Sequence, residues 1–152
     1  MQKILTCLWF NGQAEHAVKF YTSIFNNSKI LNTSYYGSEG PGEKGTLLTA
    51  VFQLNDQEFM ALNGGPVFKF NEAISLVINC KDQAEVDYYW EALTTNGGEE
   101  GPCGWCKDKY GLSWQVVPTE YFDLIHHSDP AISRKALMNT FKQKKLIISE
   151  LK

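Results

Sequence analysis

The sequence lacks any long hydrophobic run. Hydrophobic residues make up 43% of the 152 residues, but no stretch approaches the roughly 20 apolar residues that a membrane-spanning helix requires. Residues Met1 to Ile4 lead directly into strand-like sequence and do not have the layout of a secretory signal. We therefore expect a soluble, cytoplasmic protein with no membrane partner.

Positive charge is also scarce. Fourteen Lys and Arg residues stand against seventeen Asp and Glu residues, which gives a net charge of -3. Nucleic-acid binding requires a clustered positive surface, and the one basic cluster, at Lys142, Lys144 and Lys145, is better explained as a solvated helix face. The composition therefore predicts no nucleic-acid partner.

Cysteines are few, and we expect Cys7, Cys80, Cys103 and Cys106 to be thiols in a reducing cytosol. Cys103 and Cys106 form a C-x-x-C motif, which suits thiol redox chemistry when it begins a helix. Here a turn and a strand follow, and no second C-x-x-C motif or spaced His pair completes a zinc site. We expect a packing role for both residues, with a thiol oxidoreductase using Cys103 and Cys106 as an alternative.

A glycine-rich segment, Gly40 to Gly45, matches the G-x-G-x-x-G pattern of dinucleotide-binding loops. That pattern binds a pyrophosphate when its last glycine opens a helix. The residues that follow, Thr46 to Phe52, are typical of a strand, so we interpret the segment as a flexible loop between strands. With no seat for NAD or S-adenosylmethionine, we predict no cofactor.

The first half of the chain has the pattern of a strand, a helix and three strands. Apolar residues at helical spacing from Ala14 to Phe25 predict one amphipathic helix, and Asn11-Gly12 precedes it as a possible cap. The β-favouring segments predict strands over Ile4 to Phe10, Ile30 to Tyr36, Thr46 to Leu54 and Gln57 to Leu62.

The second half repeats this order. Asp82 with Glu85 forms a capping-box pattern before a helical stripe that includes Trp90. The string Gln13-Ala14-Glu15 recurs as Gln83-Ala84-Glu85 at the same point of each helix, which indicates a duplication. The predicted strands are Ala73 to Cys80, Glu99 to Gly101, Trp105 to Lys107 and Ser113 to Val117.

These patterns predict one α+β domain over residues 1–152, with a first module at about 1–66 and a second at about 72–118. A helical tail follows at about 119–152, and the irregular apolar face after Pro130 predicts one C-terminal helix. Because such a face needs cover, we expect the helix to pack on the domain or on a partner subunit.

Five strings occur in this order along the chain: Leu8–Glu15, Phe20–Phe25, Phe59–Gly65, Cys103–Asp108 and Gly111–Pro118. Together they resemble the PhnB-like branch of the glyoxalase-like, or vicinal oxygen chelate, superfamily, whose domain is often labelled 3-demethylubiquinone-9 3-methyltransferase. The resemblance implies two βαβββ modules, each a curled mixed sheet forming a half-barrel around a cavity, and a homodimer.

In metal-using members of this superfamily, His or Glu residues on the first and last strands of each module are ligands. Here those positions fall near Thr6 and on Ser75 and Gln115, which are neutral hydrogen-bonding residues. We therefore predict no metal and a small-molecule site formed by Thr6, Ser75 and Gln115, with Trp105 and Trp114 nearby.

The resulting hypothesis is a metal-free glyoxalase-like protein that binds a small apolar or aromatic ligand, because such cavities are mostly apolar with a few placed polar groups. Whether it is an enzyme stays open. A metal-dependent lyase, isomerase or dioxygenase of the same superfamily is the alternative, besides the thiol oxidoreductase.

Overall fold

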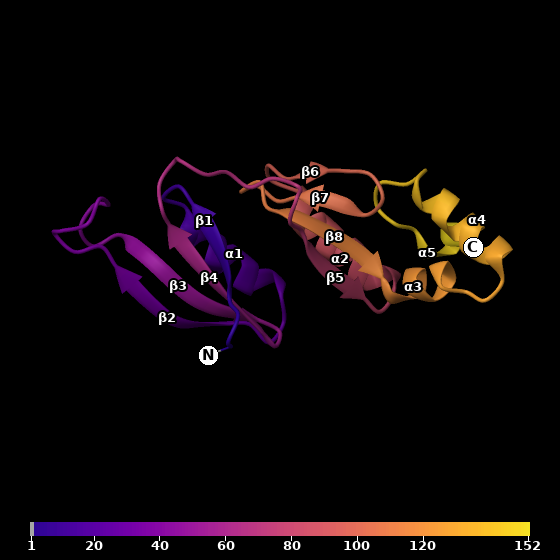
Figure 1. Ribbon diagram of the computed structural model, residues 1–152, viewed down its shortest axis with the longest axis horizontal. Coiled ribbons are helices and arrows are strands. Elements are labelled where there is room, and N and C mark those ends of the chain that lie inside the picture. Colours follow the sequence, from indigo (N-terminus) through magenta and orange to yellow (C-terminus); the bar gives the residue numbers. More distant parts are fainter. Residues whose placement is uncertain (1) are drawn as a thin grey trace. The chain divides into compact units, whose positions relative to one another are not determined.

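The computed structural model describes residues 2–152. The chain forms two compact units that meet in sequence between Lys69 and Phe70, and each unit has its own four-stranded mixed sheet (Figure 1). The α+β class with two βαβββ units is therefore confirmed. Within the described residues, no helix combines the length and apolar character needed to cross a membrane.

The first unit follows the predicted element order. Its elements are β1 (Thr6–Phe10), α1 (Ala14–Ile24), β2 (Lys29–Tyr35), β3 (Leu47–Leu54) and β4 (Gln57–Asn63). The strand order is β1-β4-β3-β2, with β1 parallel to β4 and the other pairs antiparallel. The glycine-rich segment lies between β2 and β3, as a loop, so no helix follows it.

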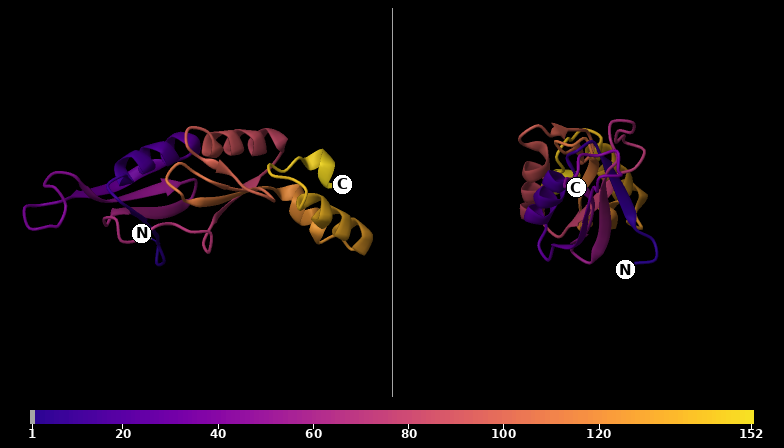
Figure 2. Two further views of the ribbon diagram at one scale, coloured as in Figure 1. Left: turned by 90° about the horizontal axis from the view of Figure 1, so that it is seen from above. Right: turned by 90° about the vertical axis from the view of Figure 1, so that its left-hand side faces the viewer.

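One face of this sheet is covered by α1, as Figure 2 shows. Tyr21 of the helix and Phe52 of β3 are both fully buried, with stacked rings 6.3 Å apart, and Phe59 of β4 stacks on Phe52 at 5.6 Å. Burying a large apolar side chain contributes roughly 1.5–3 kcal/mol. The alternation of apolar residues along the strands is what places these rings on one face.

The N-terminus of α1 is held by a residue distant in sequence. The expected cap at Asn11-Gly12 is wrong, because Asn63 Oδ1 accepts the Ala14 backbone N–H at 2.9 Å instead. Asn63 Nδ2 also donates to the Leu47 carbonyl at 2.9 Å, and the side chain is 9% exposed. A buried amide needs such partners, so Asn63 ties the helix to two strands.

The second unit repeats the same plan with shorter strands. Its elements are β5 (Leu76–Cys80), α2 (Gln83–Thr94), β6 (Glu99–Glu100), β7 (Trp105–Lys107) and β8 (Ser113–Pro118). The order β5-β8-β7-β6, again with the first strand parallel to the last, confirms the predicted duplication. The predicted cap of α2 is also confirmed, because Asp82 accepts the Glu85 N–H at 2.9 Å.

The tail is helical, as expected, but it forms three helices rather than one. They are α3 (Thr119–Ile125), α4 (Pro130–Thr140) and α5 (Ile148–Leu151). Proline lacks an N–H and cannot continue a preceding helix, but it fits the first position of a new one. Pro130 occupies that position behind the capping residue Asp129.

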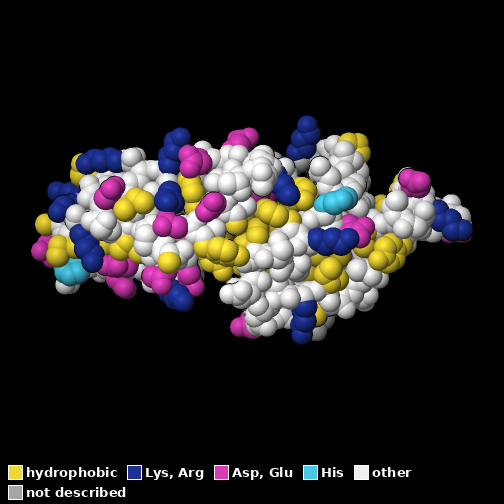
Figure 3. Space-filling view, turned by 180° about the vertical axis from the view of Figure 1, so that it is seen from behind, with side chains coloured by type: hydrophobic (Ala, Val, Ile, Leu, Met, Phe, Trp, Pro, Cys, Tyr) yellow, Lys and Arg dark blue, Asp and Glu magenta, His cyan; other side chains and the backbone are white. Residues whose placement is uncertain are grey.

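Parts of the tail are buried and parts remain exposed. Leu146 and Leu151 pack against Val117 in a small hydrophobic cluster of the second unit. Hydrophobic side chains also reach the surface among charged ones (Figure 3), and those of α3, α4 and the residue after α4 are Phe122, Ile132, Leu137, Met138 and Phe141.

Candidate functional site

The sheet of the second unit has one face that α2 covers and one that it leaves open. Along β8, Trp114 and Val116 are buried on the covered face, and the intervening Gln115 points the other way because neighbours on a strand alternate. Strand register places Gln115 between Val77 of β5 and Trp105 of β7. Val77 is 48% exposed. We call the side formed by Ser75, Val77, Trp105, Lys107 and Gln115 the open face.

Ser75 and Gln115 are brought together on the open face. Gln115 Nε2 donates a hydrogen bond of 2.8 Å to Ser75 Oγ, and both side chains are partly buried. The amide keeps its second N–H, its Oε1 acceptor and a neutral charge, and the serine keeps its O–H donor. The pair can therefore offer both donors and acceptors to a bound molecule without burying a charge.

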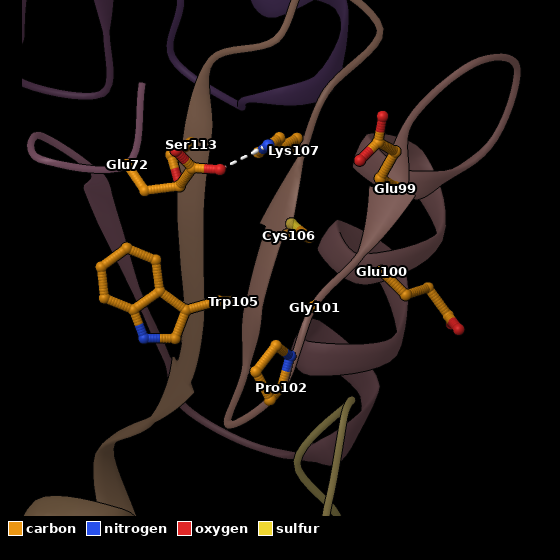
Figure 4. A pocket seen from close by; sticks show the side chains of 9 residues that line it. All are labelled: Glu72, Glu99, Glu100, Gly101, Pro102, Trp105, Cys106, Lys107 and Ser113. Atoms are coloured by element: carbon orange, nitrogen blue, oxygen red, sulfur yellow. Dashed lines mark ion pairs between the residues drawn. The ribbon is translucent and has the colours of Figure 1, made fainter. Parts of the chain in front are cut away.

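A second polar pair lies one step along the same face. Lys107 is the register partner of Ser113, and its Nζ forms an ion pair with the Glu72 carboxylate (Figure 4). This hydrogen bond lowers the pKa of Glu72 and raises the pKa of Lys107. The two charges thus largely neutralise each other at the rim of the face.

Beside these residues lies a pocket of about 230 Å³. It is lined by Glu72, Glu99, Glu100, Pro102, Trp105 and Lys107, of which Trp105 is the largest apolar side chain (Figure 4). Lys107 pairs with Glu72, and Lys144 lies 3.8 Å from the Glu100 carboxylate, so ammonium groups balance two of the three lining carboxylates. The pocket therefore presents mostly paired charges.

Of the five predicted site residues, the structure brings Ser75, Gln115 and Trp105 together. Trp114 is not with them: it is 2% exposed on the face that α2 covers, and its Nε1 donates to Asp108 Oδ2 at 2.8 Å. The prediction that Trp114 lies near the same site is therefore wrong. Adjacent residues of a strand point to opposite sides, so Gln115 and Trp114 cannot both face one cavity.

Thr6 belongs to the first unit, and its position corresponds to neither Ser75 nor Gln115 of the second unit. Phe10 pairs with Asn63 as Cys80 pairs with Pro118, so Ser75 corresponds by register to Leu5 and Gln115 to Met60. Thr6 is one residue out of step and shares the α1 side of the sheet with Leu8. The equivalent pair in the first unit is apolar.

The two cysteines of the C-x-x-C motif do not begin a helix. Cys103 lies in a turn with φ of 58°, and Cys106 is buried on the covered side of β7. Burial, with a smaller effect of the Asp108 charge, raises the pKa of Cys106 to about 12. A thiol that stays protonated is a poor nucleophile, so this geometry favours packing over redox chemistry.

Residues 2–152 contain no group of three or more His, Cys, Asp or Glu side chains placed to hold a metal ion. His16 is exposed on α1, and His126 and His127 are exposed beyond α3. The Lys107–Glu72 pair, which joins residues 35 positions apart, was not predicted from the sequence. No local spacing signals such a pair, because it joins β7 to the segment that precedes β5.

Paired βαβββ units, each with a four-stranded mixed sheet, define a glyoxalase-like, vicinal oxygen chelate fold. The chain belongs to the family described as 3-demethylubiquinone-9 3-methyltransferase, which matches residues 2–117. A PhnB protein of Bacillus cereus is 39% identical with a TM-score of 0.70, and the match covers 78% of this chain and 100% of that one.

More distant structures share the fold alone. A Pseudomonas aeruginosa protein is 19% identical with a TM-score of 0.63, over 78% of this chain and 98% of that one. The fosfomycin resistance protein FosX of Listeria monocytogenes is 14% identical with a TM-score of 0.54, over 78% and 93%. That Listeria protein has also been solved with Mn(II) and sulfate. Comparison with curated proteins finds no match.

Proposed function

We propose that this chain is a metal-free member of its superfamily that binds a small, uncharged, aromatic or apolar molecule on the open face of the second unit. The observation that carries the proposal is the 2.8 Å hydrogen bond between Ser75 and Gln115. These residues stand where the resemblance places metal ligands. Neutral Ser and Gln side chains that are hydrogen-bonded to each other are poor ligands for a divalent cation, which prefers imidazole or carboxylate ligands.

The surroundings of the pair support this ligand chemistry. Trp105 offers a flat apolar surface opposite Gln115 in the β7–β8 register, and Val77 continues it on the other side. Aromatic pairs contribute roughly 0.5–1.5 kcal/mol beyond the apolar area that they bury. The charged groups at the pocket are largely paired with one another, so an uncharged ligand need not break an ion pair. A neutral ring with one or two hydrogen-bonding substituents suits this set of groups.

The family description supplies a second candidate, methyl transfer to 3-demethylubiquinone-9. Its quinone ring is flat and uncharged, as is the ligand of the first proposal. Methyl transfer additionally requires S-adenosylmethionine. Calorimetric titration with S-adenosylmethionine distinguishes the two candidates, since measurable heat of saturable binding would favour the methyltransferase.

The main proposal is tested by nuclear magnetic resonance on the 17.2 kDa chain. The probe is 2-methoxyphenol, an uncharged ring with two oxygen substituents, and cyclohexanol is the non-aromatic control. We expect saturable shifts of the Gln115 side-chain amide and the Trp105 indole N–H signals. Shifts confined to other residues, or none with either compound, would refute this placement of the site.

A further inference from the structure

The tail reaches the turn that precedes Trp105. Cys103 donates its backbone N–H to the Gln143 carbonyl at 2.8 Å, and Gly104 donates to the Lys144 carbonyl at 2.7 Å. On its other side the turn is joined to β8, because Val116 donates to the Gly104 carbonyl at 2.8 Å. Hydrogen bonds therefore join the turn to β8 on one side and to the segment Gln143–Leu146 on the other. We call this segment the strap.

The strap fits closely against this turn. Gly104 has φ of +80°, and a Cβ added there would lie 2.9 Å from the Val116 carbonyl oxygen and 3.1 Å from Leu146 Cδ1. A contact below 3 Å with backbone leaves no room for a side chain. Leu146 itself is 1% exposed. The strap is thus a packed layer on the turn, with little freedom to slide.

One side chain of α2 holds the strap in place. Gln83 Nε2 donates to the Leu146 carbonyl at 3.1 Å, and Gln83 Oε1 accepts the Ile148 N–H at 2.8 Å. Both bonds reach residues more than 60 positions away, so no local helix geometry requires them. Gln83 belongs to the repeated Gln-Ala-Glu string, and its counterpart Gln13 in the first unit is an exposed residue.

Two ion pairs also bind the strap, one to α2 and one to a residue that lines the pocket. Lys145 forms an ion pair with Asp87 of α2 at 2.7 Å, and Lys144 lies 3.8 Å from the Glu100 carboxylate. Glu100 and Trp105 both line the pocket, and Gly101 donates its N–H to the Trp105 carbonyl at 2.8 Å. The strap is consequently connected to the pocket through the turn and through Glu100.

We infer that Gln83 is a positioning residue of the proposed binding site: it clamps the strap, the strap holds the Cys103-Gly104 turn, and the turn orients Trp105 on the open face. The inference rests on the proposed function for its effect on binding. The family match ends at residue 117, so the strap is an element that the matched region does not contain.

The test compares Gln83→Leu with Gln13→Leu, which changes the same residue type at the same motif position of the other unit. A second clamp variant, Ile148→Pro, removes the N–H donor at the first position of α5, where proline is tolerated. Ile147 before it has φ of -108° and ψ of 110°, which a residue preceding proline adopts readily.

The first readout needs no ligand. In Gln83→Leu and Ile148→Pro we expect amide hydrogen exchange at Cys103 and Gly104 to accelerate roughly ten-fold or more, and the Trp105 indole signal to shift. Gln13→Leu should change neither. Exchange of the β5 amides in the second unit serves as the folding control and should stay as in the wild type.

The second readout is affinity for 2-methoxyphenol, which should fall about three- to ten-fold in both clamp variants and not in Gln13→Leu. Unchanged exchange at Cys103 and Gly104 would overturn the inference whether or not the compound binds. Faster exchange with unchanged affinity would also overturn it, because the turn would then not position the site. If the wild type binds no compound, the proposed function fails, while the exchange data still decide whether Gln83 holds the turn.

Discussion

Replacing Gln115 by Leu removes the polar centre of the proposed site at nearly constant volume. The change deletes the Nε2 donor that lies 2.8 Å from Ser75 Oγ, and it deletes the remaining amide donor and acceptor. Ser75 is partly exposed, so water can replace the lost partner. We therefore expect the free energy of unfolding to change by less than about 1 kcal/mol.

The effect on binding should be larger. A ligand polar group that loses its partner in a partly buried site costs about 1–3 kcal/mol. At 1.4 kcal/mol for each factor of ten, this corresponds to a Kd increased by roughly 5- to 150-fold. The contribution of Trp105 stays, so the variant should keep weak binding of purely apolar rings. This selectivity separates a lost hydrogen bond from a general collapse of the site.

Affinity is measured by titrating 2-methoxyphenol and benzene into wild type, Gln115→Leu and the control Gln13→Leu, and stability by urea unfolding. A double variant, Cys103→Ser with Cys106→Ser, should retain binding, because we assign both cysteines a packing role. Equal affinity of wild type and Gln115→Leu would refute the site. So would a cysteine variant that folds but no longer binds the compound.

Four further predictions follow from other parts of the chain. Elemental analysis after growth in Zn-, Ni- and Mn-supplemented medium should find no stoichiometric metal, and one ion per chain retained through dialysis would contradict this. Light scattering should give a homodimer, since the exposed apolar side chains of α4 need cover; a mass near 17 kDa would count against it. Iodoacetamide at pH 8 should not label Cys106 in the folded protein, because a pKa of about 12 leaves roughly one thiol in ten thousand as the thiolate. Rapid labelling of Cys106, detected by peptide mass mapping, would overturn its packing role. Asn63→Ala should lower the free energy of unfolding by about 1–3 kcal/mol, whereas Asn11→Ala should leave it nearly unchanged. A larger loss of stability in Asn11→Ala than in Asn63→Ala would instead support a cap at Asn11.

The element order could be predicted from the sequence because its signals are local. Apolar residues every three or four positions mark α1 and α2, alternation marks β3, and Asp82 with Glu85 marks the start of α2. The site residues were harder to predict, because they were placed by counting residues along a strand, and that count must be exact. A slip of one residue moves a side chain to the other face, and this is why Thr6 and Trp114 were misplaced.

Contacts between distant segments could not be predicted at all. Asn63 caps α1 from 49 positions away, and Gln83 holds a carbonyl 63 positions away. Both partners are backbone groups, which every residue carries, so their residue types hold no information about the pairing. Only the folded arrangement selects which carbonyl or N–H is left for these side chains.

Because the two units share one plan, residues that differ between matched positions can be compared directly. Both units share strand order, helix position and the parallel pairing of first and last strands, so the fold itself requires neither a polar nor an apolar pair at the matched site. The first unit has Leu5 and Met60 there, and the second has Ser75 and Gln115. In the second unit, Gln83 also hydrogen-bonds to Leu146 of the strap and to Ile148. Gln13, at the same motif position of the first unit, is exposed. Leu146 of the strap also packs in the hydrophobic cluster of the second unit, so the strap serves folding there. The two departures from the common plan meet around Trp105, and the binding role proposed for the second unit gives both of them one explanation.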